Sequence, residues 1–449
     1  MTPIDPSIFK AYDIRGLVPE QLQPEVARRV GRAFVDYLGA GRIAVGRDCR
    51  LSSPDLARAF VEGARSQGAA VVDIGTVGTD ILYYYVARHE LDGGAIVTAS
   101  HNPRQYNGIK MVREGALALS GDAGIREIRE RVMAGHYADR PAARGGLEET
   151  AVGEDYARHC LSFIDPSRVP RLRVVLDTAN GMGAIGAEAV FAHLPVETVR
   201  MYFELDGTFP NHPADPLLEE NRRDVVDRVR AEGADLGIAW DGDADRCFFV
   251  DDTGSYVPGD FVTAILGEAF ARAEPGARIV YDVRASRAVA ERVRAAGGVP
   301  LMNRVGHAFI KKRMREERAV FGGEVSGHFY FRENWFADNG MIPALLVLER
   351  LGREGRRLSE ILAPLRERYH ISGEINSRID DVERALARLE QRYGEGRLTK
   401  LDGVSVDFDD WHFNVRPSNT EPLLRLNLEA FSDDEMRRRR DEVLAVIRG

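Results

Sequence analysis

The sequence predicts an α/β protein in which three similar α/β units precede a small α+β domain. Three segments share one pattern: a short β-rich run ends in a polar turn and leads into a helix-like stretch. These segments are RIAVGRD (42–48), LRVVLDTA (172–179) and ARIVYDVR (277–284). Strands that alternate with helices indicate βαβ units and a largely parallel sheet. A chain of 449 residues is too long for one hydrophobic core and predicts roughly three or four domains.

The three units are expected to place polar loops at the same edge of their sheets. Each unit has a third strand, at 93–97, 235–240 and 318–322. The loops that follow these strands are TASHNP (98–103), DGDADR (241–246) and GEVSGH (323–328). Ligands of open α/β sheets bind beyond the carboxyl ends of the strands. The three loops are therefore predicted to converge on one cleft, with Ser100 just past the end of its strand.

Changes in composition predict the domain boundaries. A Gly, Pro and Arg-rich stretch (135–149), a turn-rich passage (251–260) and the segment ISGEINSR (371–378) separate the units from one another and from the tail. The tail is expected to form an α+β domain, with a helix near 379–393 and a last helix from about 432. The predicted domains are 1–145, 146–252, 253–368 and 369–449.

Composition and charge limit the class of protein and its partners. Hydrophobic residues make up 44% and charged residues 29% of the chain, as in ordinary globular proteins. The net charge of −9 implies no basic surface, so we expect no nucleic-acid partner. No apolar run approaches the roughly 18 residues of a membrane helix, and the N-terminal stretch does not read as a signal peptide. The three cysteines form no CxxC pair, which favours a reducing compartment and predicts a cytoplasmic protein without a membrane partner.

The loop DGDADR is the strongest chemical signal in the sequence. Asp241, Asp243 and Asp245 alternate, so their carboxylates can converge on one hard cation such as Mg²⁺ or Ca²⁺. An EF-hand is excluded, because Arg246 stands where that loop requires glycine and Asp252 where it requires glutamate. Three carboxylates between two buried strands would repel one another without a cation or basic groups. The loop therefore predicts a metal site.

Two further loops have the composition of ligand-binding loops. In RPSNTEP (416–422), Arg416 can hold a phosphate through two hydrogen bonds, although the composition also suits an ordinary turn. The other side chains that would complete this phosphate cradle are Ser418, Asn419 and Thr420. In GEVSGH, Glu324 and Ser326 are spaced to hold neighbouring sugar hydroxyls. The sequence contains no P-loop, no GxGxxG after a strand and no GxSxG elbow.

Five motifs together resemble one enzyme superfamily. The motifs YDIRG (12–16), TASHNP, DGDADR, GEVSGH and RPSNTEP occur in this order along the whole chain. Together they resemble the α-D-phosphohexomutase superfamily, and within it the bacterial phosphomannomutase/phosphoglucomutase group most closely. The resemblance implies four domains around a central cleft and phosphosugars as small-molecule partners. It also implies reversible conversion of a hexose 1-phosphate, of mannose or glucose, to the 6-phosphate through a bound hexose 1,6-bisphosphate.

The resemblance also assigns roles to residues. Ser100 is expected to carry the phosphoryl group as a phosphoserine, bridged to Mg²⁺ at Asp241, Asp243 and Asp245. Positive charge beside it is expected from Lys110, His101 and Arg246. Candidates for acid, base or electrostatic help are Arg15, Lys110 and His307, which the sequence does not rank. The remaining assignments are Tyr12 to the substrate, Glu324 and Ser326 to the sugar, and Arg416, Ser418, Asn419 and Thr420 to the phosphate that is not reacting.

Two departures from the family pattern keep alternatives open. Val325 stands in the sugar loop where dual mannose/glucose enzymes have methionine and phosphoglucosamine mutases have glutamine. Arg284 stands where related enzymes often carry a lysine, which keeps the charge and changes the geometry. The alternatives are a phosphoglucosamine mutase, a catalytically silent sugar-phosphate sensor and a metal-dependent phosphatase.

Overall fold

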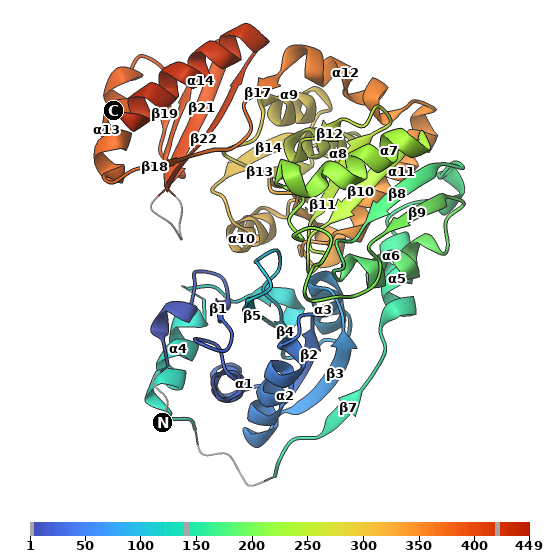
Figure 1. Ribbon diagram of the computed structural model, residues 1–449, viewed down its shortest axis with the longest axis vertical. Coiled ribbons are helices and arrows are strands. Elements are labelled where there is room, and N and C mark those ends of the chain that lie inside the picture. The colour runs from blue at the N-terminus through green and yellow to red at the C-terminus, as the bar shows by residue number, and fades with distance from the viewer. Residues whose placement is uncertain (1–3, 122, 139–142, 418–422) are drawn as a thin grey trace. The chain divides into compact units, whose positions relative to one another are not determined.

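The computed structural model describes residues 4–121, 123–138, 143–417 and 423–449. It divides into two compact units, one of Met1–Val257 with Ser326–Leu358 and one of Pro258–Val325 with Ser359–Gly449. Figure 1 shows the elements with their labels. The expected succession of strands and helices is present in each unit.

The N-terminal part of the first unit is built on a seven-stranded sheet in the order β1-β5-β4-β2-β3-β7, with β6 paired to β5. Neighbours among β4, β2, β3 and β7 are parallel, whereas β5 is antiparallel to β4 and to β1. The strands are β1 (Ile14–Leu17), β2 (Arg42–Arg47), β3 (Ala70–Thr76), β4 (Gly93–Val97), β5 (Tyr106–Arg113), β6 (Leu117–Ala118) and β7 (Leu147–Glu149). The helices are α1 (Pro24–Leu38), α2 (Ser53–Ser66), α3 (Thr79–Arg88) and α4 (Ile125–Ala134).

Helices α1 and α2 pack with their backbones almost in contact. A Cβ on Gly31 would lie 2.2 Å from the carbonyl oxygen of Phe60, and one on Gly63 would lie 1.9 Å from that of Arg28. Only glycine permits this approach, so the two residues fix where the helices cross. The core beside them is formed by buried apolar side chains of α1, α2 and the central strands.

A second sheet in the first unit has the order β12-β11-β10-β8-β9. Strand β8 is parallel to β9 and β10, and β11 is antiparallel to β10. The strands are β8 (Arg173–Asp177), β9 (Glu197–Met201), β10 (Leu236–Trp240), β11 (Cys247–Asp251) and β12 (Tyr256–Val257). The helices are α5 (Gly153–Leu161), α6 (Gly183–Phe191) and α7 (Arg223–Glu232), and the later segment of this unit adds β16 (Phe329–Phe331) and α11 (Met341–Glu354).

The second unit contains a parallel α/β layer and an antiparallel sheet. Strand β13 (Arg278–Asp282) lies between β14 (Val299–Asn303) and β15 (Phe321–Gly323) and is parallel to both. Its helices are α8 (Gly259–Ala273), α9 (Arg287–Ala295), α10 (His307–Glu317) and α12 (Leu358–Arg368). The C-terminal sheet follows the order β17-β22-β21-β20-β19, with β18 also paired to β22.

The C-terminal part is the small α+β domain that the sequence predicts. Its strands are β17 (His370–Ile371), β18 (Ile375–Arg378), β19 (Arg397–Thr399), β20 (Val404–Asp407), β21 (Trp411–Pro417) and β22 (Leu423–Ala430). Helices α13 (Val382–Arg392) and α14 (Asp433–Arg448) pack against one another, and α14 lies along β22 (Figure 1). Ser432 caps α14 by accepting from the amide of Glu435 at 3.3 Å, which explains where the last helix begins.

The predicted strands and helices are confirmed, with one shift. The strand expected at 318–322 begins only at Phe321. Arg318 adopts a left-handed φ of 52° at the end of α10, so the chain is still leaving the helix at that residue. No helix in the described ranges has the length and apolar character needed to cross a bilayer.

Candidate active site

Ser100 lies beyond the carboxyl end of β4, in a loop that a buried ion pair holds in place. Its φ of 51° is left-handed, which is uncommon for a residue with a side chain. Arg50 donates hydrogen bonds to the carbonyl oxygens of Ser100 at 2.8 Å and Asn102 at 2.6 Å. Arg50 is only 1% exposed, and its Nε lies 3.1 Å from Oδ2 of Asp48. Hydrogen bonds from Arg50 therefore hold the backbone around Ser100 in place.

The Ser100 hydroxyl faces the DGDADR loop of the second sheet. Its Oγ donates to Oδ2 of Asp241 at 3.0 Å and lies 3.2 Å from Nδ1 of His101. A Cβ on Gly242 would lie 2.4 Å from the carbonyl oxygen of Ser100, so the two loops touch through their backbones. The structure thus brings together the first two loops that the sequence predicts to converge.

The three aspartates of this loop form a compact cluster of oxygen atoms. One carboxylate oxygen each of Asp241, Asp243 and Asp245 lies within 4.8 Å of the others, and all three residues are at most 2% exposed. Ala244 has a left-handed φ of 61°, and this turn lies between the second and third carboxylates. The alternation read from the sequence therefore places all three side chains on the inside of the loop.

The cluster has the properties of a divalent-cation site. Lys110 Nζ lies 2.7 Å from Oδ2 of Asp243 and 2.6 Å from Oδ2 of Asp245, and Arg246 Nε lies 3.2 Å from Oδ2 of Asp241. Two basic groups thus face three carboxylates, which leaves an excess of negative charge. Oδ1 of Asp243 is buried and accepts no hydrogen bond from any residue that the structure describes. Carboxylate oxygens are the ligands that Mg²⁺ prefers, so these residues fit such an ion.

Burial and neighbouring charges shift the pKa values at the site in opposite directions. Burial, with the carboxylates of Asp245 and Asp243, raises the pKa of Asp241 to about 7 against the opposing charge of Arg246. Burial alone would lower the pKa of Lys110, but the carboxylates of Asp243 and Asp245 raise it well above its usual range. Lys110 is therefore an ammonium group at every working pH.

His101 does not supply the positive charge expected of it. Burial, reinforced by the positive charges of Arg246 and Arg15, lowers the pKa of His101 well below its usual range. The imidazole is therefore neutral, with its Nδ1 against both Ser100 Oγ and Arg246 Nη2. The charge beside Ser100 comes instead from Lys110 and Arg246.

The YDIRG motif reaches the Ser100 loop through Arg15. Arg15 Nη1 donates to Oδ1 of Asn102 at 2.5 Å, and its Nη2 pairs with Asp13. Strand β1 carries Arg15 directly opposite Gly108 of β5, which explains this placement. Tyr12 lies two residues before β1 and is partly exposed.

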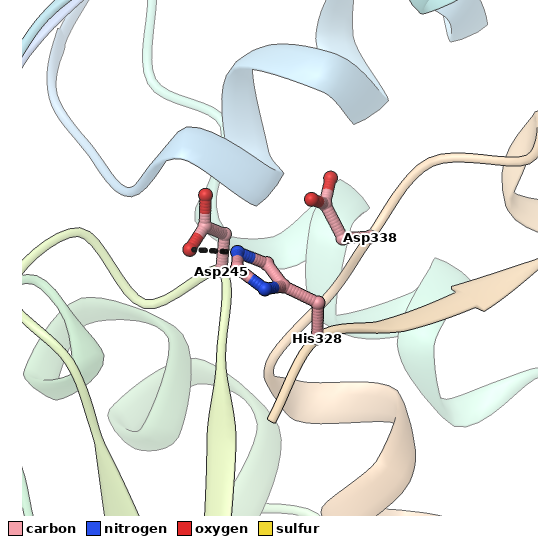
Figure 2. A group of neighbouring side chains, drawn as sticks. All are labelled: Asp245, His328 and Asp338. Atoms are coloured by element: carbon pink, nitrogen blue, oxygen red, sulfur yellow. Dashed lines mark ion pairs between the residues drawn. The ribbon is translucent and has the colours of Figure 1, made fainter. Parts of the chain in front are cut away.

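A second group of side chains extends the aspartate cluster in a way that the sequence reading missed. Nε2 of His328 lies 3.5 Å from Oδ1 of Asp245, and Asp338 contributes a carboxylate oxygen within 4.8 Å of both (Figure 2). His328 ends the GEVSGH motif, and its Nδ1 lies 3.1 Å from the Ser326 hydroxyl. From this motif, the sequence predicts only Glu324 and Ser326 as site residues, although His328 belongs to the same motif.

Two more supporting residues were also missed. Thr79 begins α3, and its amide and hydroxyl donate to Asp243 O at 2.9 Å and Asp243 Oδ2 at 2.5 Å. Arg50 holds the Ser100 loop as described above. No motif marks either residue, because each is brought to the site by packing between segments far apart in the sequence.

In the second unit, Glu324 of the predicted sugar loop lies beside the start of α10. Glu324 is 2% exposed, and its Oε1 accepts from the amide of Gly306 at 2.9 Å. His307 follows Gly306 as the first residue of α10. The amide of Val325 donates to Oδ2 of Asp282 at 2.9 Å. The loop that carries Glu324 is thus tied by its backbone to the end of β13.

Arg284 uses a geometry that lysine does not have. Its Nε and Nη2 donate to the two oxygens of Asp282 at 2.9 and 3.0 Å, and its Nη1 lies 3.3 Å from Oε2 of Glu374. A planar guanidinium can bind both carboxylates at once, whereas an ammonium is a single point charge. Arginine at position 284 therefore keeps the positive charge of the lysine in related enzymes and adds a fixed orientation.

Glu374 forms ion pairs with three arginines of the second unit. Besides Arg284, it binds Arg416 Nη2 at 3.4 Å and Arg425 Nη1 at 3.1 Å. Burial would raise the pKa of Glu374, but these three guanidinium groups lower it below its usual range. Nε of Arg416 is buried and donates to no acceptor in the described part of the chain. The predicted phosphate ligands Ser418, Asn419 and Thr420 lie outside the described residues.

Comparison with known proteins accounts for these motifs. Four family models, described as phosphoglucomutase/phosphomannomutase, match the chain in succession. They are alpha/beta/alpha domain I at residues 6–138, domain II at 154–254, domain III at 258–369 and the C-terminal domain at 374–446.

Individual relatives match along almost the whole chain. A protein of Xanthomonas campestris pv. campestris described as "Phosphohexose mutases" is 44% identical over 447 residues, 98% of this chain and 99% of that protein. A phosphomannomutase of Salmonella montevideo is 42% identical over 448 residues, 98% of each chain. The crystal structure of a phosphoglucomutase/phosphomannomutase family protein from Burkholderia thailandensis has a TM-score of 0.90 at 33% identity and covers 99% of this chain and 97% of its own. The chain belongs to the phosphoglucomutase/phosphomannomutase family and is a phosphohexomutase, an isomerase of hexose phosphates.

Proposed function

We propose that this mutase converts the 1-phosphate of mannose or glucose to the 6-phosphate with Ser100 as its phosphoryl carrier. The observation that carries the proposal is the buried Ser100 hydroxyl, whose Oγ donates at 3.0 Å to an aspartate of a three-carboxylate loop. An ordinary turn serine would be exposed, whereas Ser100 is 3% exposed and is held by Arg50. This arrangement suits a side chain that must be positioned for a group transfer.

The proposed cycle consists of two transfers that balance one another. In the first, the bond between phosphorus and Ser100 Oγ breaks, and the phosphoryl group bonds to O6 of the hexose 1-phosphate, which loses its proton to a base. In the second, the hexose 1,6-bisphosphate has turned, the bond between phosphorus and O1 breaks, the phosphoryl group bonds again to Ser100 Oγ, and O1 takes up the proton. The product is the hexose 6-phosphate, and the enzyme is again phosphorylated. No external phosphate donor is consumed in a complete cycle.

The charges around Ser100 suit this chemistry. Mg²⁺, when bound by Asp241, Asp243 and Asp245, would neutralise phosphoserine and make Ser100 Oγ a better leaving group. Lys110 Nζ lies 2.7 Å from Asp243 and 2.6 Å from Asp245, so it is placed to offer positive charge or a proton to the reacting groups. Arg15 lies at Asn102 of the same loop and offers a second fixed positive charge.

A further set of residues is proposed to bind the parts of the substrate that do not react. Glu324 and Ser326 would hold the sugar hydroxyls, and His307 stands beside Glu324 as a further acid or base candidate. Arg416, with its buried Nε, would hold the phosphate at the far end of the hexose. Ser418, Asn419, Thr420 and Tyr12 complete the proposed set.

Phosphorus NMR tests the proposal directly. Purified protein is given Mg²⁺, a trace of glucose 1,6-bisphosphate, and mannose 1-phosphate or glucose 1-phosphate. We expect a 6-phosphate signal, and the two rates rank the sugars. Conversion of glucosamine 1-phosphate alone would assign a phosphoglucosamine mutase, and release of inorganic phosphate would assign a phosphatase.

A variant of Ser100 tests the carrier. Ser100→Ala should lower turnover by about a thousandfold or more, since it removes the hydroxyl that would carry the phosphoryl group, while substrate binding survives. Ser7→Ala is the matched control, because Ser7 is exposed at the N-terminal end of the chain. Full activity of Ser100→Ala would overturn the assignment of the carrier while leaving the mutase assignment intact.

A further inference from the structure

A cavity of about 570 Å³ lies between α3 and α5 of the first unit, away from the aspartate cluster. It is lined by Tyr84, Arg88, His89, Asp155, Arg158 and His159. Its volume is in the range of small-molecule sites. None of its lining residues belongs to the motifs that the mutase reaction uses.

The charge of the cavity is positive, although the chain as a whole carries −9. Two guanidinium groups line it, Arg88 at the end of α3 and Arg158 near the end of α5. Asp155 pairs with Arg158. Arg88 makes no ion pair and no side-chain hydrogen bond to any other residue that the structure describes. One arginine is thus uncompensated, and arginine forks match the oxygen geometry of phosphate groups.

Two of the lining residues, Tyr84 and His159, belong to a cluster of packed rings. The ring of Tyr84 lies 4.9 Å from that of His159, and Trp335 stacks on His159 at 5.2 Å and 27°. His159 Nε2 lies 2.8 Å from Oδ1 of Asn334, which holds the ring in place. Burial lowers the pKa of His159, so its ring is neutral. Tyr84 is only 3% exposed, whereas His159 is partly exposed, so the imidazole is the ring that a ligand in the cavity can contact. A neutral imidazole beside two guanidinium groups suits a ligand with both a ring and a phosphate.

The cavity is separate from the Ser100 site, although one helix connects them. Helix α3 begins with Thr79, which binds Asp243, and ends with Arg88, which lines the cavity. Ten helical residues span about 15 Å, so a hexose phosphate at Ser100 does not reach Arg88. We propose that this cavity is a second binding site, and that it takes a small phosphate monoester with a ring system, such as a nucleoside monophosphate.

Calorimetric titration with adenosine monophosphate tests the proposal, with adenosine as the probe that lacks the phosphate. Saturating glucose 1-phosphate and Mg²⁺ keep the Ser100 site filled with substrate and product. We expect adenosine monophosphate to bind at least about tenfold more tightly than adenosine, because charge-assisted hydrogen bonds to the arginines add to the ring contacts. Trp335, which stacks on His159, should report the same binding by a change in fluorescence.

Two variants locate the site. Arg88→Ala combined with Arg158→Ala should weaken binding of adenosine monophosphate at least about tenfold and leave the mutase rate without nucleotide unchanged. Arg88→Glu is the second variant, and its added negative charge should abolish binding. Arg58→Ala is the matched control, because Arg58 of α2 is as exposed as Arg158, both at 72%. Equal binding of adenosine and its monophosphate, no binding of either, or unchanged binding in the double variant would overturn the proposal.

Discussion

Replacement of Gly242 by alanine tests whether the two loops must touch for catalysis. The new Cβ would lie 2.4 Å from the carbonyl oxygen of Ser100, whereas an ordinary contact begins near 3.4 Å. The aspartate loop must therefore move by about 1 Å relative to Ser100, and a displacement of this size costs on the order of a hundredfold in rate. Gly242 is not in the left-handed region, so the effect comes from the clash and not from backbone strain.

The assay is mutase turnover by Gly242→Ala with glucose 1-phosphate and a trace of glucose 1,6-bisphosphate, together with chemical denaturation. We expect kcat to fall about a hundredfold and the free energy of unfolding to fall by about 1–3 kcal/mol. Gly153→Ala is the control, because a Cβ at Gly153 meets no atom within 4 Å. A kcat within twofold of that of the native protein would refute the reasoning, since the loops would then tolerate the displacement.

Three further predictions concern stability. Mg²⁺ at about a hundred times its dissociation constant should raise the free energy of unfolding by about 2.7 kcal/mol, and the thermal shift should disappear with EDTA or in Asp243→Asn. Arg50→Met should lower the free energy of unfolding by about 3–5 kcal/mol, because it leaves the buried Asp48 carboxylate without its guanidinium partner. A decrease below about 1 kcal/mol in chemical denaturation would contradict this. Burial raises the pKa of Asp80 from 3.8 to about 8, so the folded state holds a proton that the unfolded chain releases, and stability falls as pH rises between these values. Asp80→Asn should remove this loss, and urea denaturation at about pH 5 and about pH 8 should show a smaller difference for the variant than for the native protein.

The parts of the fold set by local pattern could be predicted from the sequence. The strands before TASHNP and DGDADR are short apolar runs that end in polar turns, and the structure places them at Gly93–Val97 and Leu236–Trp240. The alternation of three aspartates was sufficient to predict a shared cluster, because residues on one short loop cannot lie far apart. The third strand of the third unit was misplaced, since Arg318 gives no sign in the sequence that it ends a helix in a left-handed conformation.

The supporting residues could not be predicted, because they reach the site through packing. Arg50 lies 50 residues before Ser100 in the sequence, and Thr79 lies 164 residues before Asp243. A sequence pattern records neighbours along the chain, whereas these contacts depend on how strands and helices from distant segments pack together. The protonation state of His101 could not be predicted for the same reason, because burial beside Arg246 lowers the pKa of the imidazole.

The backbone contact between Gly242 and Ser100 ties reactivity to the order in which the chain is made. A nascent chain that has emerged only as far as α4 already carries Ser100, but it has neither the carboxylates nor the arginine of the loop at 241–246. Its serine therefore lacks the acidic and basic neighbours that the proposed phosphoryl transfer uses. Only a chain that extends past β11 can hold both loops against each other, so a product truncated before that point lacks the contact on which the proposed transfer depends.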